Sequence, residues 1–386
     1  MQWIQKISGL LIVTGLLAGC SQTTLPTNQR SGMPSVRSAS GEIQMEEHFV
    51  PVVSRVPSMT GSVSQLYVRE RVKDSVRTQE NLQGKVVLFI HGAGTPAEVA
   101  FDVPYPGFSW MAYLADKGMD TFAMDMTGYG RSTRPLVMND RCNLSPAQQQ
   151  ELFGNSCQPS YEFAITSMDS DWQDIDAVVD YLRDLRGVDK VHLVGWSQGG
   201  PRSGGYAAQH PEKVASMVLL APAYRGDVPA TIDAANFNGT AMTKQSRDDF
   251  VNNWNRQVGC EDQYDQAVSD TVWSEMLASD PVGATWGTGV RRAPRAVTFG
   301  WGTEVVANTR TPILMVAGTH DGQVNTQLVK NLYADYGATE KVYLEMTCSS
   351  HNAMWEKDAQ LLFDATYQWL NTTTYNGVSS GMLMQE

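Results

Sequence analysis

Residues 190–210 of this 386-residue chain read KVHLVGWSQGGPRSGGYAAQH. The apolar run Val191–Val194 predicts a buried strand, and Gln198–His210 has the pattern of a helix. Between them, GWSQG at 195–199 matches the G-x-S-x-G elbow, in which a sharp strand-to-helix turn presents a serine at the top of a sheet. The glycines are needed because a side chain at either position would collide with the flanking strand or helix. The stretch therefore predicts that Ser197 is a nucleophile.

Strand and helix patterns alternate on both sides of this elbow. The strands expected are 85–90, 121–126, 190–195, 214–222, 312–318 and 342–346, and the helices are 108–117, 171–186, 198–210, 324–336 and 353–370. Two more strand-like runs, rich in Val and Tyr, lie between Phe49 and Val72. Alternation of this kind predicts βαβ units, so the fold class expected is α/β with a mostly parallel central sheet flanked by helices.

The composition is that of a folded protein without obvious cofactor motifs. Hydrophobic residues make up 42% of the chain, which requires a packed core and excludes a fibrous or disordered protein. The net charge of −12, without a long basic run, argues against nucleic acid or an anionic membrane surface as the main partner. The sequence lacks H-E-x-x-H, zinc-type cysteine spacing and a G-x-G-x-x-G after a strand. We therefore expect no metal and no cofactor.

Two long stretches interrupt the alternation. Residues 132–166 contain three prolines and two cysteines, and residues 223–310 contain four tryptophans. Loops of this length usually have a function or structure of their own. Two interpretations of the tryptophans are compatible with each other. In the first they form the core of a small subdomain, and in the second some of them line an apolar pocket over the active site. The second reading predicts a cap over 223–310, inserted into a core of 41–222 and 311–386. The pocket candidates are Trp196, Trp254 and Trp286.

A serine hydroxyl becomes nucleophilic when a base takes its proton and a carboxylate orients that base. With a G-x-S-x-G elbow, the chain order is serine, then acid, then histidine. Of the histidines after Ser197, His351 follows the last apolar strand and precedes a helix, where a loop histidine could reach the serine. His210 is expected to cap the elbow helix, and His320 to pack locally. His351 is therefore the predicted base.

The orienting acid is expected at the end of a neighbouring strand. Asp321 follows the strand at 312–318, which places its carboxylate in the loop beside that of His351. Glu345 is the alternative acid, although it lies inside the strand pattern at 342–346. The position at a strand end favours Asp321.

Residues 85–371 resemble an α/β-hydrolase. The resemblance rests on the segments HGAG at 91–94, DMTGYGRS at 125–132 and GWSQG at 195–199, followed by Asp321 and His351 in family order. It implies that Ser197 is the nucleophile, His351 the base and Asp321 the orienting acid. The oxyanion hole would use the backbone N–H groups of Ala93 and Gln198. The stretch 125–132 is usually scaffolding in this family.

The resemblance implies hydrolysis of a small-molecule carboxylic ester through an acyl-serine intermediate. The aromatic residues of 223–310 favour an apolar or aromatic substrate. One alternative is hydrolysis of a lactone, thioester or amide, or an aminopeptidase, on the same fold. Another is a catalytically idle hydrolase fold that binds a partner at the cell surface. The serine argues against dehalogenase and epoxide hydrolase chemistry, for which this family uses an aspartate nucleophile.

The N-terminus has the pattern of an export signal. Lys6 precedes an apolar run of thirteen residues, too few to span a bilayer, that ends in LAGC at 17–20. These four residues resemble the bacterial lipoprotein box, which implies that Cys20 carries the lipid and that Ser21 favours the outer membrane. Residues 21–40 are expected to form a flexible tether. The expectation is a lipid-anchored protein of the bacterial cell envelope, facing the periplasm or the surface, that meets the membrane only through Cys20. An ordinary signal peptide is the alternative.

Four cysteines remain if Cys20 is lipidated, and an even count in an exported chain favours disulfides. Cys142 and Cys157 share one insertion and can pair without the rest of the fold. That leaves Cys260 to pair with Cys348, three residues before His351. Four free thiols are the alternative.

Overall fold

The structure, a computed structural model, describes residues 42–231, 241–287, 289–292 and 298–385. The expected signal segment, Cys20 and the tether lie outside the described residues. Within the described part of the chain, no helix is both long and apolar enough to cross a membrane. The described residues belong to one compact unit.

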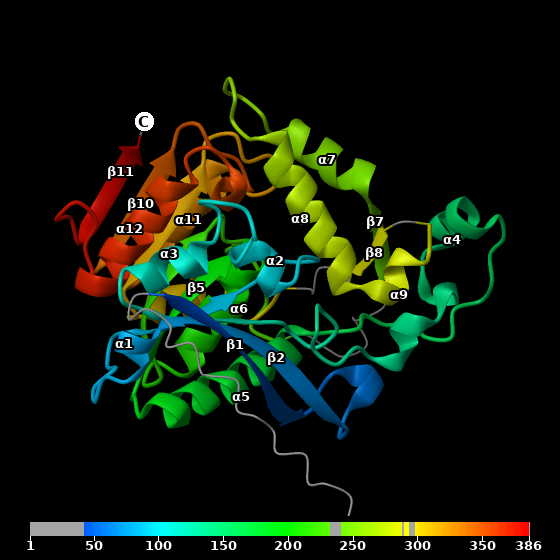
Figure 1. Cartoon of the computed structure of the whole chain (residues 1–386), viewed down its shortest axis with the longest axis horizontal. Helices are drawn as coiled ribbons and strands as arrows, with labels where there is room; N and C mark the ends of the chain where they lie inside the picture. The colour runs from blue at the N-terminus through cyan, green and yellow to red at the C-terminus, as the bar shows by residue number, and fades with distance from the viewer. Residues whose placement is uncertain (1–41, 232–240, 288, 293–297, 386) are drawn as a thin grey trace, which may run out of the picture. The chain divides into compact units, whose positions relative to one another are not determined.

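A nine-stranded sheet forms the centre of this unit, in the order β1-β2-β4-β3-β5-β6-β9-β10-β11 (Figure 1). The strands are β1 (Ile43–Val53), β2 (Val63–Lys73), β3 (Val86–Ile90), β4 (Asp120–Met124), β5 (Val191–Trp196), β6 (Val214–Leu220), β9 (Ile313–Gly318), β10 (Lys341–Met346) and β11 (Ser380–Gln385). The pairs β1–β2 and β2–β4 are antiparallel, and the remaining pairs are parallel. The predicted fold class is confirmed.

Two groups of helices pack on the sheet. One consists of α3 (Trp110–Asp116) and α12 (Ala359–Thr372), which contact each other. The other consists of α5 (Met168–Arg186), α6 (Gly199–Gln209), α10 (Thr303–Asn308) and α11 (Thr326–Asp335), each in contact with the next in line. The shorter helices in this part of the chain are η1 (Pro57–Met59), α1 (Asp74–Arg77) and α2 (Ala97–Phe101).

The structure differs from the sequence prediction mainly at short elements and edges. The helix expected over 353–370 is divided into a 3₁₀ turn, η5 (Ala353–Trp355), and α12. Helix α2 and strand β11 were not predicted. β11 is an edge strand that alternates between exposed and half-buried residues, so it lacks the continuous apolar run of a central parallel strand.

The two insertions pack together. The elements between β6 and β9, besides α10, are β7 (Thr243–Ser246), α7 (Arg247–Asn255), α8 (Gln266–Ser279), α9 (Pro281–Ala284) and β8 (Gly289–Arg292). Residues 132–166 contribute η2 (Leu136–Asn139), η3 (Arg141–Asn143) and α4 (Pro146–Phe153). Gln148 Nε2 of α4 donates to Lys244 O of β7 over 2.7 Å. Arg291 of β8 donates to Met138 O over 2.7 Å. Helix α10 instead contacts α6 and α11 of the core.

The cysteines lie in the expected pairs. The Cα atoms of Cys142 and Cys157 are 5.3 Å apart, and those of Cys260 and Cys348 are 5.8 Å apart, both within the range that a disulfide requires. The first pair closes a loop inside the 132–166 insertion. The second pair joins the segment between α7 and α8 to the loop that carries His351.

Mass mapping of peptides from the non-reduced protein should therefore find Cys142 linked to Cys157, and Cys260 linked to Cys348. In the chain-entropy model, replacing the first pair by serines should lower the free energy of unfolding by about 3 kcal/mol. Activity should remain, because no residue of 132–166 lines the cavity that contains Ser197 and His351. Replacing the second pair should lower activity as well as stability. Free thiols, or a peptide linking Cys142 to Cys260, would contradict the pairing.

Candidate active site

The elbow holds Ser197 in a backbone conformation that side chains rarely adopt. Its φ is +57°, in the left-handed region, between the end of β5 and the start of α6. A Cβ on Gly195 would lie 2.6 Å from Gly199 O, and a Cβ on Gly199 would overlap Ile90 O of β3. Both glycines of the motif are thus required by close backbone approaches, as the sequence predicted.

His351 and Asp321 form a buried pair. His351 Nδ1 lies 2.8 Å from Asp321 Oδ2, and both side chains are almost completely buried. The other oxygen of Asp321 accepts hydrogen bonds from the backbone N–H groups of Gln323 (2.7 Å) and Val324 (2.8 Å), which fix the carboxylate. Since a carboxylate only accepts, Nδ1 of His351 carries the proton and donates. The neutral ring then leaves Nε2 free to act as a base.

The alternative acid serves another function. Glu345 accepts a hydrogen bond from Tyr343 OH (2.7 Å) and pairs with Lys330 Nζ (2.9 Å). It therefore holds β10 to α11, and Asp321 is the carboxylate that orients His351. His210 caps the end of α6, as expected. His320 does not pack locally, because its ring lies against Gly259 and 3.5 Å from Cys260 Sγ, in the segment between α7 and α8.

Ser197 and His351 line the same cavity, which has a volume of about 680 Å³. Trp196 and Ala93 line it too. The wall contributed by β7 and α7 is mostly polar: it includes Thr243, Gln245, Asn252 and Asn253, together with the aromatic Phe250. The apolar cap expected over the serine is therefore present only in part at this wall.

Of the three tryptophans expected in the pocket, the structure brings only Trp196 to the cavity. Trp254 is fully buried, stacks on Tyr264, and donates its indole N–H to Glu356 over 2.8 Å. Trp286 packs against Phe153 in a small second core. A buried tryptophan needs a partner for its N–H, and Glu356 is that partner for Trp254. Trp254 belongs to the main hydrophobic core, where it contacts Trp355, so the other interpretation of the sequence, a core of the inserted part itself, holds for Trp286 alone.

Glu356 connects the cap to the histidine loop, and no sequence signal marked it. Its buried carboxylate accepts hydrogen bonds from the backbone N–H of Ser350 (2.7 Å), from Trp254 and from Gln263 Nε2 (3.1 Å). Burial raises the pKa of Glu356, and these donors oppose that rise. On the other side of the loop, Trp196 Nε1 donates to His351 O over 2.8 Å. The loop that carries the base is thus held from two directions.

Buried donors hold the carbonyl groups of the loop after β3. Arg202 of α6, completely buried, donates to His91 O (2.9 Å) and Gly92 O (3.1 Å), and its Nε pairs with Asp171 over 2.7 Å. His91 Nε2 accepts from the backbone N–H of Met126, so its Nδ1 carries the proton and donates to Gly92 O over 2.7 Å. Burial, aided by the nearby Arg202 charge, lowers the pKa of His91 well below its usual value.

The hydrogen bonds from Arg202 and His91 orient the backbone N–H of Ala93, which is expected in the oxyanion hole. In a trans peptide, the C=O of one residue and the N–H of the next point in opposite directions. With Gly92 O directed at Arg202, the N–H of Ala93 is turned away from it. Arg202 is therefore a positioning residue for that amide.

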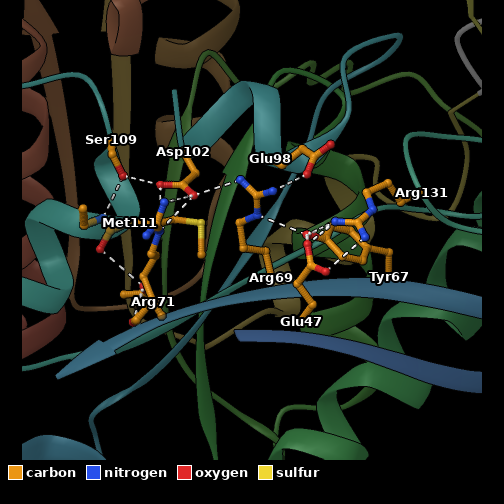
Figure 2. Close-up of polar contacts among 11 residues, drawn as sticks. Glu47, Tyr67, Arg69, Arg71, Glu98, Asp102, Ser109, Met111 and Arg131 are labelled. Carbon is orange, nitrogen blue, oxygen red and sulfur yellow. Dashed lines mark hydrogen bonds and ion pairs between the residues drawn. The ribbon is translucent and has the colours of Figure 1, made fainter. Parts of the chain in front are cut away.

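Ion pairs fix the far end of the same loop, where α2 begins. Figure 2 shows Arg69 of β2 reaching two carboxylates of this segment, Glu98 (2.6 Å) and Asp102 (3.1 Å). Burial raises the pKa of Glu98 to about 7. Asp125, from the DMTGYGRS stretch, accepts from the backbone N–H of Ala97 at the first residue of α2 (2.7 Å). That stretch thus acts as scaffolding for the loop.

Replacing Arg202 by methionine should lower kcat by about 10²-fold, because the Ala93 amide loses its fixed orientation. It should also destabilise the fold by about 3–5 kcal/mol, because Asp171 is left as an unpaired buried charge. The double variant Arg202→Met/Asp171→Asn removes that charge and should regain stability without regaining kcat. Steady-state kinetics and thermal unfolding test both effects. Recovery of kcat together with stability would show that Arg202 serves folding only.

The chain matches the family model described as alpha/beta hydrolase fold over residues 85–358. It is 54% identical over 46 residues to the poly(3-hydroxyalkanoate) polymerase subunit PhaC of Allochromatium vinosum, a match that covers 12% of this chain and 13% of that protein. The chain spans well under half the length of the curated relatives that it matches.

Solved structures show the same fold. A serine hydrolase involved in carbazole degradation (CarC) is 18% identical, with a TM-score of 0.52 over 85% of this chain and 99% of that one. The esterase EaEST from Exiguobacterium antarcticum is 12% identical, with a TM-score of 0.51 over 84% and 100%. At such identities the likeness shows the fold alone. The family match covers most of the described chain, and the chain therefore belongs to the α/β hydrolase fold family.

Proposed function

We propose that this protein is a serine esterase, in which Ser197 attacks the carbonyl carbon of a carboxylic ester. The observation that carries the proposal is the buried His351–Asp321 hydrogen bond beside a cavity that Ser197 also lines. An elbow serine, a histidine with a free Nε2 and an orienting carboxylate are the parts that acyl transfer needs. The esterase EaEST shares the fold.

The reaction would proceed in two steps. His351 Nε2 takes the proton of the Ser197 hydroxyl as its oxygen bonds to the carbonyl carbon, and the proton then passes to the departing alcohol. Water enters next and bonds to the acyl carbon as His351 Nε2 takes its proton. His351 then returns that proton to the Ser197 oxygen as the bond from this oxygen to the acyl carbon breaks, which releases the acid and restores the free serine. In both steps the carbonyl oxygen becomes negative, and the backbone N–H groups of Ala93 and Gln198 would donate to it.

Hydrolysis of a lactone, thioester or amide would use the same residues. An idle fold that only binds a partner would keep the shape without the reactivity. A fluorophosphonate probe separates an active hydrolase, whatever its substrate, from an idle fold, because it bonds to an activated serine and leaves an idle one unlabelled.

Ser197→Ala and His351→Ala should each lower kcat on an aryl ester by roughly 10⁴–10⁶-fold, and the double variant should be little worse, since the residues act as a unit. Asp321→Asn should cost less. Glu345→Gln is the matched control and should have no effect, because its carboxylate contacts β10 and α11 instead of the base. Near-native turnover by Ser197→Ala would refute the mechanism, and a large loss in Glu345→Gln would move the acid assignment.

We also propose that the protein is exported and anchored by a lipid on Cys20, on the sequence pattern of residues 6–20 alone. Cys20→Ser should then move the protein out of the membrane fraction while its specific activity stays unchanged, because the tether separates the anchor from the fold. Cell fractionation with an activity assay measures both. Unchanged membrane retention would exclude the lipid anchor.

A further inference from the structure

Arg292, the last residue of β8, lies against the loop that carries the proposed oxyanion donor. Its guanidinium donates to Ala93 O over 2.7 Å, and it lines the cavity together with Ser197. It also lies directly over Gly94, where an added Cβ would overlap Nε and Cζ of the arginine. Gly94 has a φ of +81°, so both the conformation and the packing of the arginine call for glycine there.

No carboxylate among the described residues forms an ion pair with Arg292. The contrast with its neighbour Arg291 is direct, since Arg291 pairs with Asp280 at 2.6 Å. Burial lowers the pKa of Arg292, and the attraction of Tyr129 and Asp249 only partly opposes this. A partly desolvated guanidinium without a paired anion is a ready partner for an anion that enters the cavity.

The charged residues that line the cavity also favour an anionic ligand. Its charged lining residues are Arg256, Arg292 and Asp249. Asp249 already accepts hydrogen bonds from the backbone N–H and hydroxyl of Ser246. Apart from His351 and its partner Asp321, the lining therefore has two arginines against one carboxylate, although the whole chain carries −12. The cavity thus concentrates arginine on a protein that is acidic overall.

The guanidinium is close to the reacting serine. A Cβ on Gly92 would lie 2.9 Å from Ser197 Cβ, so the serine sits against Gly92 and the arginine against Gly94. Two residues of chain span at most about 7 Å. A group bound to Arg292 would therefore lie in the same cavity as the carbonyl that Ser197 attacks.

We propose that Arg292 binds a carboxylate of the substrate, which makes the preferred substrates small esters with a carboxylate a few bonds from the ester carbonyl. Arginine matches a carboxylate with two parallel N–H donors, which gives both affinity and orientation. The polar side chains of β7 and α7 on the cavity wall suit such a substrate better than a long apolar acyl chain. The inference rests on the proposed esterase function for its kinetic test, but the carboxylate site itself does not depend on catalysis.

Two pairs of esters test the preference and locate the carboxylate. Monomethyl glutarate against dimethyl glutarate places the charge on the acyl side. The compound 3-butanoyloxypropanoate against its methyl ester places it on the alcohol side. We expect wild-type kcat/KM to favour the anion by about 10- to 100-fold in one of the pairs, the range of a hydrogen-bonded charge. In Arg292→Met this ratio should fall to near one, mostly through KM, and Arg292→Lys should keep part of it.

Arg247→Gln is the matched control. Arg247, at the start of α7, is exposed and paired with Asp270, and it does not line the cavity. The Arg247→Gln variant, like Arg292→Met, removes one positive charge from the inserted part of the chain. It should leave the kcat/KM preference for the anionic ester unchanged. A wild-type ratio near one in both pairs, or a preference that survives Arg292→Met, would overturn the inference.

A binding measurement separates this inference from the proposed function. Titration calorimetry of Ser197→Ala with glutarate should detect binding, at least tenfold weaker in Ser197→Ala/Arg292→Met, with none for the neutral glutaramide. If glutarate binds in this way while no ester is hydrolysed, the esterase proposal fails and the carboxylate site stands. If esters are hydrolysed but glutarate does not bind, or binds equally to both variants, the carboxylate site is wrong.

Discussion

The close approach of the elbow to the loop after β3 is the constraint on which the rest of the site depends. Gly199 lies against Ile90 O and Gly92 against Ser197, so neither segment can move without the other. Arg202 strengthens this contact from within, because a helix residue on the elbow side donates to two carbonyl groups of the opposite loop. The proposed nucleophile and the proposed oxyanion donors are thereby held as one unit.

The base reaches that unit through a second set of contacts, which come from the inserted part of the chain. Glu356 binds Trp254 of α7 and the backbone next to His351, while Asp321 is fixed by two amides of its own loop. The cap is therefore more than a cover, because its core tryptophan helps to hold the catalytic histidine in place. Removing a hydrogen-bond donor from a buried carboxylate such as Glu356 lowers stability. The contacts of Glu356 with Trp254 and with the histidine loop therefore support one another.

The sequence predicted those features that local patterns determine. Strands such as β3 and β5 are buried on both faces and read as continuous apolar runs, and Asp321 was recognisable because it stands at a strand end. Glu345 has the same chemistry but points to Tyr343 and Lys330, a difference that only the packed structure shows. The prediction that Trp254 and Trp286 line the pocket was wrong for a related reason. Composition indicates that tryptophans are buried, but it does not show which residues they pack against. Arg292 is almost a hundred residues from Ser197 in the chain, and only the pairing of β8 with β7 brings it to the cavity.

The position of Arg292 also explains how an acidic protein could accept an anionic substrate. At physiological salt, charges more than about 8 Å apart across solvent are largely screened, so the chain's overall charge acts weakly on a small molecule inside the cavity. A guanidinium that is partly desolvated and lines the same cavity as Ser197 is screened much less. In the proposed binding of a carboxylate, Arg292 therefore matters more than the carboxylates on the outer surface of the protein. It donates to Ala93 O, in the loop that carries the proposed oxyanion donor, so substrate recognition and the catalytic step would share one loop.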